Sequence, residues 1–334
     1  MDIERLKQLI IRYRNSIDYY KNKKNAYNEQ SCRDEYINPL LECFGWDVQN
    51  KKGTLPQYKE VVVEQFSNNT ERPDYTLTLN GVSKIFVEAK KPSVDITVDP
   101  EPAMQARKYG WNAKHALVVL TNFENLIIYD TINQPQAGDD VNTSVYRKYY
   151  FEEYARKFQE INDLISRESV YSGKYDEFTK GNFQNERRFS AEIDETFLKQ
   201  LNDWRVKLGQ YLYEKNEKYT NIAYLNDKVQ EFINQVIFLR ICEDRKLPLY
   251  KNLYEVSTNK DVLQESLLHV FKEADKRYNS GLFKGENTIF DLNRNIIFEM
   301  IESLYYPQTP YMFSIIEPSI LGKIYEAFLT ESLI

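Results

Sequence analysis

The chain has 334 residues, and its 44 Lys and Arg against 50 Asp and Glu give a formal net charge of −6. This length can form two domains with separate cores, and no apolar run reaches the roughly 20 residues that a membrane-spanning helix needs. Two His are too few for a multi-histidine metal site, and the 11 Gly form neither a dinucleotide fingerprint nor a phosphate-binding loop. Three Cys and the lack of a signal sequence predict a cytoplasmic protein with no membrane association.

Helical periodicity dominates the N-terminal region. We predict an amphipathic helix over about 2–26 and a second helix that begins at an Asn28 cap and stops at Gly45. The second helix carries apolar side chains at four-residue steps, namely Cys32, Tyr36, Leu40 and Phe44. This spacing predicts that one face of the helix is buried in a core.

Alternating and apolar segments then indicate a sheet. Strands are predicted at 59–66, 74–79, 83–90, 116–121 and 126–130. A helix at about 101–112 interrupts them, and a surface loop at 133–144 and a helix at about 150–166 follow. The mixture predicts an α/β domain over residues 1–166.

The rest of the chain has a different pattern. The polar, weakly periodic stretch 167–192 predicts a linker. Residues 193–334 show only helical periodicity, which predicts an all-α domain with helices near 193–215, 222–246, 260–278, 291–304 and 318–331. In the second of these helices we expect a set of solvated ion pairs with a structural role, formed by Arg240, Glu243, Asp244 and Arg245.

The segment from residue 72 to residue 91 is the most informative. Two alternating stretches flank Asn80-Gly81, which is a strong hairpin signal. We predict a three-residue connection over 80–82, because a two-residue loop would scatter the apolar residues over both faces. The predicted register forms one apolar face from three cross-strand pairs, Tyr75 with Val87, Leu77 with Ile85, and Leu79 with Ser83.

The other face of this hairpin carries Asp74 opposite Glu88, with Lys90 further along the same side. Two neighbouring carboxylates repel each other unless a cation lies between them, and Mg²⁺ prefers oxygen ligands of this kind. A lysine beside such an ion can orient or deprotonate an attacking water. The pattern predicts metal-assisted hydrolysis of a phosphodiester, and a surface hairpin with a cross-strand ion pair is the structural alternative.

Two further features lie outside the hairpin. Glu29 falls within the apolar stripe of the second helix, where a carboxylate is unfavourable without a partner. A favourable first-turn position in the helix dipole is the alternative explanation for Glu29. Gln105 and Tyr109 lie four residues apart on one face of the helix at about 101–112, a spacing that by itself is also typical of packing.

Together these residues resemble a known family. Asp74, Glu88 and Lys90 have the form of the PD-(D/E)xK nuclease superfamily. RPDYTL and IFVEAKK, with NEQSCRDEYINPLLECFGWDV, QARKY and ALVVLTNFENLIIYDT, look like the N-terminal nuclease domain of Type IIG restriction-modification enzymes and of the related Type I motor subunits. NDWRVKLGQYLY, FINQVIFLRICEDRKLPLY and ILGKIYEAFL are similar to the helical connector that precedes the adenine methyltransferase domain of Type IIG enzymes.

The resemblance implies a mixed sheet flanked by helices, followed by an all-α connector, with the active site on the polar face of the hairpin. It implies that Asp74, Glu88 and Glu29 hold Mg²⁺, with Mn²⁺ as a substitute, and that Lys90 is the active-site lysine. Gln105 and Tyr109 then form an accessory Gln-x-x-x-Tyr element.

The implied function is that of a Type II site-specific deoxyribonuclease acting on double-stranded DNA. The chain lacks the glycine-rich and Asn-Pro-Pro-Tyr motifs of the methyltransferase, so S-adenosylmethionine is expected only in a longer parent protein. We therefore expect a fragment that methyltransferase and target-recognition domains follow. The alternative is a non-catalytic module that uses the nuclease fold to position DNA or to dock another domain.

Overall fold

The computed structural model describes residues 2–24, 26–64, 72–182, 186–245, 247–249, 252–279, 281–305, 308–309, 311–316 and 322. The chain divides into two compact units, Met1–Phe189 and Ser190–Ile334. Among the described residues, no helix is both long and apolar enough to cross a membrane. The helix expected at 318–331 lies outside the described residues except for residue 322, as do the last two residues of the strand expected at 59–66.

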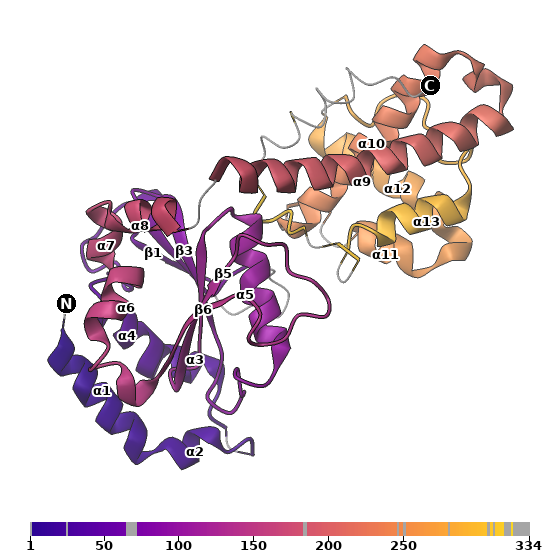
Figure 1. Ribbon diagram of the computed structural model, residues 1–334. Helices are drawn as coiled ribbons and strands as arrows, with labels where there is room; N and C mark the ends of the chain where they lie inside the picture. Colours follow the sequence, from indigo (N-terminus) through magenta and orange to yellow (C-terminus); the bar gives the residue numbers. More distant parts are fainter. Residues whose placement is uncertain are drawn as a thin grey trace. The chain divides into compact units, whose positions relative to one another are not determined.

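A six-stranded sheet forms the centre of the first unit, in the order β1-β2-β3-β4-β5-β6 (Figure 1). Its strands are β1 (Val61–Val63), β2 (Tyr75–Leu79), β3 (Val82–Ala89), β4 (Leu117–Thr121), β5 (Asn125–Asp130) and β6 (Val145–Tyr150). β3 and β4 are parallel, whereas the other neighbouring pairs are antiparallel. The predicted α/β fold with a mixed sheet is confirmed.

The strand β6 is an addition to the sequence analysis, because it lies between the loop predicted at 133–144 and the helix predicted from about 150. As an edge strand, β6 exposes Arg147, Lys148 and Tyr150, so its sequence lacks the apolar alternation by which the other strands are found. The helix expected at about 150–166 is correspondingly shorter. It is α6 (Phe158–Ile165), preceded by a 3₁₀ turn over Phe151–Glu153.

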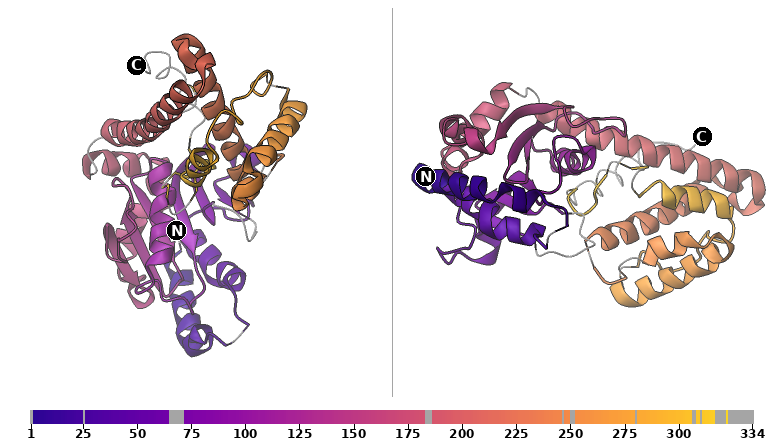
Figure 2. Two further views of the ribbon diagram at one scale, coloured as in Figure 1. Left: turned by 90° about the vertical axis from the view of Figure 1, so that its right-hand side faces the viewer. Right: turned by 90° about the horizontal axis from the view of Figure 1, so that it is seen from below.

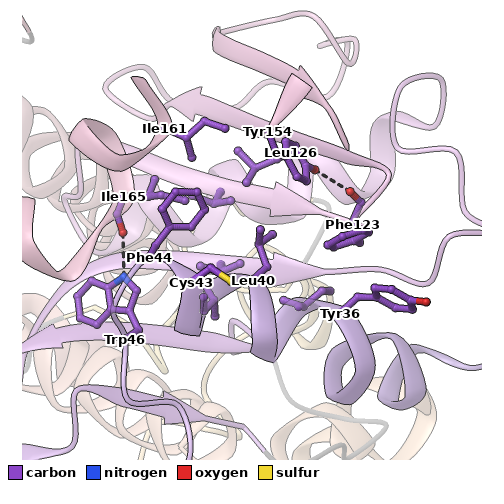
Figure 3. Packing of buried hydrophobic residues seen from close by; sticks show 14 of the residues in the cluster. Tyr36, Leu40, Cys43, Phe44, Trp46, Phe123, Leu126, Tyr154, Ile161 and Ile165 are labelled. Atoms are coloured by element: carbon purple, nitrogen blue, oxygen red, sulfur yellow. Dashed lines mark hydrogen bonds between the residues drawn. The ribbon is translucent and has the colours of Figure 1, made fainter. Parts of the chain in front are cut away.

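Helices lie on both sides of the sheet, with α1 (Ile3–Asn15), α4 (Asn38–Cys43) and α6 on one side and α5 (Pro100–Asn112) on the other (Figure 1). The helix predicted over 2–26 is divided at Ser16 into α1 and α2 (Ile17–Lys21). The larger core lies on the side of α1, α4 and α6 (Figure 3). Two buried donors are satisfied there, because the Trp46 indole bonds to the carbonyl of Ile165 at 2.8 Å and the Tyr154 hydroxyl bonds to the carbonyl of Phe123 at 2.6 Å.

The predicted helix over residues 28–45 contains an irregular turn. Asn28 caps α3 (Glu29–Cys32) by accepting the N–H of Ser31 at 2.8 Å, and Gly45 follows α4 with a φ of +90°. Between them lies a π-helical turn, Arg33–Ile37. In a regular α-helix, four-residue steps from residue 32 to residue 44 drift by about 120°, and one widened turn removes most of that drift. The whole apolar stripe is thereby buried, as predicted, at Cys32, Tyr36, Leu40 and Phe44.

The hairpin of β2 and β3 has the predicted register over its inner half, where Tyr75 pairs with Val87 and Leu77 with Ile85. At the turn the prediction is wrong, because Leu79 pairs with Val82 across the two residues Asn80-Gly81. Both have positive φ, +51° and +83°, which is typical of the tight turns that Asn-Gly favours. A bulge next to Leu77 absorbs the extra residue and restores the register.

Residues 167–182, which lie within the expected linker, are helical. They form α7 (Arg167–Tyr171) and α8 (Lys174–Asn182), and Val170 and Tyr175 belong to the core of the first unit. Most side chains of these short helices are polar, so the sequence shows no clear helical periodicity. The few buried residues are too far apart to form a recognisable apolar pattern.

The secondary structure of the described part of the second unit is helical, with loops between the helices (Figure 2). They are α9 (Glu186–Lys215), α10 (Ile222–Asp244), α11 (Asn252–Thr258), α12 (Leu263–Tyr278) and α13 (Arg294–Glu302). α9 contacts the end of α13, where the Trp204 indole bonds to the Ser303 hydroxyl at 3.1 Å. Four of these helices agree with the predicted ones, and α11 is an addition.

The charged set on α10 is structural, as expected, but it is buried rather than solvated. Arg240 pairs with Asp244 and donates to the carbonyl of Leu304 at 3.0 Å, with its guanidinium 4.2 Å from the centre of the Tyr305 ring. Glu243 accepts the N–H of Tyr254 at 3.0 Å and the hydroxyl of Tyr305. Burial of these charges is tolerated because each carboxylate is paired or hydrogen-bonded.

The close packing around Gly81 predicts that its replacement by Ala destabilises the protein more than the replacement of Gly53 does. A Cβ on Gly81 would lie 2.4 Å from the carbonyl oxygen of Gln57, whereas a Cβ on Gly53 would meet no heavy atom of the described residues within 4 Å. Both glycines have positive φ, so both pay the same backbone cost on replacement by Ala. We expect Gly81→Ala to lower the free energy of unfolding by at least about 1 kcal/mol more than Gly53→Ala, measured by urea denaturation. Equal losses would show that the turn relaxes freely.

Candidate active site

Asp74 and Glu88 lie beside each other at one end of the β2–β3 hairpin. Asp74 immediately precedes β2, and one carboxylate oxygen, Oδ2, accepts the backbone N–H of Ala89 at 2.7 Å. The other oxygen, Oδ1, accepts from Nη1 of Arg33 at 3.0 Å. Burial raises the pKa of Asp74 above its ordinary value, although the Ala89 N–H, Arg33 and Lys90 act in the opposite direction. Asp74 is thus a nearly buried carboxylate held at both oxygens.

Glu88 is the most deeply buried carboxylate of the site, with 2% of its surface exposed. Its Oε1 accepts from Nζ of Lys90 at 2.5 Å, whereas its buried Oε2 has no hydrogen-bond partner among the described residues. Burial, reinforced by the charge of Asp74, raises the pKa of Glu88 to about 8. An orphaned oxygen of this kind costs free energy in the absence of a ligand.

The ammonium of Lys90 stays charged in this environment. Burial opposes the charged form, but the neighbouring carboxylates, Glu88 foremost, outweigh it and raise the pKa of Lys90 above its ordinary value. Lys90 follows β3, and its N–H bonds to the carbonyl of Thr121 at the end of β4 at 2.9 Å. The parallel pairing of β3 and β4 therefore fixes the backbone of the lysine.

Glu29 reaches the same group of charges from α3. The residue is half-buried, and burial raises the pKa of Glu29, with Asp74 adding to the shift and Lys90 and Arg33 opposing it. Lys90 and Arg33 thus offset part of the cost of burying the Glu29 carboxylate. The structure thus brings together Glu29, Asp74, Glu88 and Lys90, which come from three different elements.

Gln105 and Tyr109 interact on α5, where Nε2 of Gln105 donates to the Tyr109 hydroxyl at 2.9 Å. α5 packs against β3 and β4. Because Ile85, Val87 and Ala89 belong to the larger core on the opposite face, strand alternation turns Glu88 toward the side of α5. The pair therefore approaches the sheet from the side of Glu88, and its contribution to the site stays a prediction.

The donors present fit a hard divalent cation. Among the described residues, no group of three or more His, Cys, Asp or Glu side chains is placed to hold a metal ion. Mg²⁺ is commonly bound by only one or two carboxylates and completes its shell with water and substrate phosphate. Asp74 and the orphaned oxygen of Glu88 provide such a pair, and burial raises the pKa of both carboxylates, so a bound cation would stabilise their ionised forms.

Arg33 is a site residue that the sequence analysis did not find. It lies in the stretch RDEYI, whose three consecutive charged residues are typical of a solvated helix face. The side chain is nevertheless 1% exposed, because the π turn carries it toward the start of β2. Periodicity calculated for a regular α-helix cannot reveal this direction.

Comparison with known proteins places these residues in context. A family model described as the N terminus of the Type I restriction enzyme R protein matches residues 58–137, which contain the hairpin and α5. The chain is also 44% identical over 336 residues to the "Type II restriction enzyme and methyltransferase RM.Eco57I" of Escherichia coli, an alignment that covers 98% of the chain and 33% of that protein. Nearly the whole chain is therefore homologous to one part of a Type II restriction enzyme and methyltransferase.

The predicted resemblance to this family is therefore confirmed. The chain spans about a third of the length of the curated relative that it matches. No solved structure matches the chain.

The raised pKa of Glu88 predicts a pH-dependent stability in the presence of a chelator. The folded protein holds this proton up to a pH of about 8, whereas the unfolded chain releases it near the ordinary glutamate pKa of 4.5. The stability that the proton contributes is therefore present at low pH and is lost as the pH rises through about 8. We expect the free energy of unfolding to fall over this window, and to fall less steeply in Glu88→Gln. Urea denaturation at several pH values measures both slopes, and equal slopes would contradict the assignment.

Proposed function

We propose that this chain is the metal-dependent endonuclease part of a restriction-modification enzyme, and that it hydrolyses phosphodiester bonds in double-stranded DNA. The observation that carries the proposal is the buried Glu88, whose Oε2 is unpartnered among the described residues, beside Asp74 and Lys90. Homology to a restriction enzyme and methyltransferase supports DNA as the substrate.

Asp74 and Glu88 would hold Mg²⁺, or Mn²⁺ in its place, and we propose that Glu29, whose charge influences Glu88, contributes to the metal site through water. When bound, the cation supplies Lewis-acid stabilisation of charge on the phosphate. Lys90 is held as an ammonium by Glu88, so it serves as a fixed positive charge that orients the attacking water and offsets the charge of the transition state. Gln105 and Tyr109 are proposed to position the substrate from α5.

The wider assignments follow from the same homology. We propose that methyltransferase and target-recognition domains belong to the parent protein, which would use S-adenosylmethionine, because the curated relative is both a restriction enzyme and a methyltransferase. We also propose a cytoplasmic location, where the buried free thiols of Cys32, Cys43 and Cys242 remain reduced.

Cleavage of supercoiled plasmid tests the proposal directly. The wild-type chain is expected to nick or linearise plasmid in Mg²⁺ and in Mn²⁺ and to be inactive in a chelator. Asp74→Ala and Lys90→Ala should each lower the rate by about 100-fold or more, because each removes a group that acts on the developing charge. Gel electrophoresis over a time course measures the rates.

Asp176→Asn is the matched control. Asp176 is also paired with a lysine, Lys84, at 2.9 Å, but it lies on α8 in a half-exposed pair, and its variant should cleave at the wild-type rate. Cleavage retained by pure Asp74→Ala would remove that residue from the mechanism. Metal-independent DNA binding without cleavage, unchanged by Asp74→Ala, would instead favour the non-catalytic module.

A further inference from the structure

The guanidinium of Arg33 donates its hydrogen bonds to groups around the start of β2. Its Nη1 donates to Oδ1 of Asp74 at 3.0 Å, and its Nη2 donates to the carbonyls of Glu64 at 2.8 Å and of Asp74 at 3.4 Å. Its Nε donates to the Tyr75 hydroxyl at 3.3 Å, and its guanidinium lies 4.9 Å from the centre of the Tyr75 ring. This buried arginine therefore joins the π turn to the end of β1 and to the residue that precedes β2.

The two bonds to Asp74 oppose each other across the carboxylate. Arg33 holds Oδ1 and the Ala89 N–H holds Oδ2, so the group cannot rotate without breaking one of them. Each carboxylate oxygen has a second lone pair, which stays available to a cation. We propose that Arg33 is a positioning residue, which holds the Asp74 carboxylate in the orientation that lets Asp74 and Glu88 bind the same divalent cation. This inference rests on the proposed function.

The contacts favour a fixed support over a latch that leaves when metal binds. A guanidinium bonded to the carboxylate alone could swing away from it. Arg33 is also bonded to two backbone carbonyls and to Tyr75, whose hydroxyl in turn donates to Oδ1 of Asn38 at 2.8 Å. If the guanidinium moved away from Asp74, it would also break its bonds to the two backbone carbonyls and to Tyr75. Loss of buried hydrogen bonds is unfavourable, so the arginine is expected to stay in place.

A lysine cannot reproduce this arrangement. The guanidinium is a planar fork that serves several acceptors in fixed directions, whereas an ammonium is a compact charge on a flexible stem. Arg33→Lys keeps the charge near Asp74 but loses the simultaneous bonds to Asp74, Glu64 and Tyr75. The substitution therefore separates the charge of Arg33 from its geometry.

Binding of Mn²⁺ to the full chain tests the inference, with isothermal titration calorimetry for affinity and thermal unfolding for stability. We expect Arg33→Lys and Arg33→Met to bind Mn²⁺ about 10-fold more weakly than wild type or worse, as is typical when a residue that orients a metal ligand is lost. Should Arg33→Met not fold, Arg33→Lys, which keeps the charge, carries the test. Asp74→Ala gives the reference for loss of the ligand itself.

Arg107→Lys is the matched control for burial. Arg107 is 2% exposed and donates to Asp139 at 2.7 Å, so its replacement also breaks a buried arginine–aspartate pair in the first unit. It should lose stability yet bind Mn²⁺ as wild type does. Wild-type or tighter binding by folded Arg33→Lys, with Asp74→Ala weakened, would overturn the inference alone. Wild-type binding no stronger than that of Asp74→Ala would overturn the proposed function as well.

Discussion

Burial of negative charge is the constraint on which the candidate site depends. Glu29, Asp74 and Glu88 lie where the sheet and α3 exclude much of the solvent, and burial raises the pKa of all three. The charge of Asp74 raises the pKa of Glu29 and Glu88 further, and the charge of Glu29 adds to the shift at Glu88. Two positively charged side chains lie among these three carboxylates, because Arg33 pairs with Asp74 and Lys90 pairs with Glu88. One negative charge is left over, so a proton on Glu88 and a bound cation are alternative ways to balance it.

The same ion pairs tie the secondary structure together. Asp74 and Glu88 are level with each other because the Tyr75–Val87 pairing sets the hairpin register, and Lys90 is fixed because β3 continues beside β4. Arg33 adds the helix to this frame, since its side chain reaches from the π turn to Asp74. A π turn has a wider circumference than an α turn, so it lets Tyr36 remain in the core while Arg33 points elsewhere. The π turn thus allows this helix to contribute Tyr36 to the core and Arg33 to the candidate site.

Local sequence signals were sufficient for much of this arrangement. Alternation and the Asn-Gly turn gave the inner hairpin register, and a carboxylate in an apolar stripe pointed to Glu29, because both follow from periodicity over a few residues. The sequence pattern did not predict the structure where contacts with distant segments determine the local conformation. The edge strand β6 shows exposed polar residues, Arg33 lies in a charged run, and the bulge beside Leu77 has no mark in the sequence. Such features are determined by packing against distant segments, which one sequence does not display.

The buried charges on α10 and those of the candidate site differ in one respect that bears on function. On α10, each oxygen of Glu243 and Asp244 accepts a hydrogen bond from described residues, so no carboxylate oxygen of this network is left without a partner. In the first unit, Oε2 of Glu88 is equally enclosed yet accepts none from the described residues. Folding alone selects for satisfied groups, because an orphaned buried oxygen lowers stability. A cation bound beside Asp74 would give Oε2 of Glu88 the partner that it lacks among the described residues, which supports the proposed metal site.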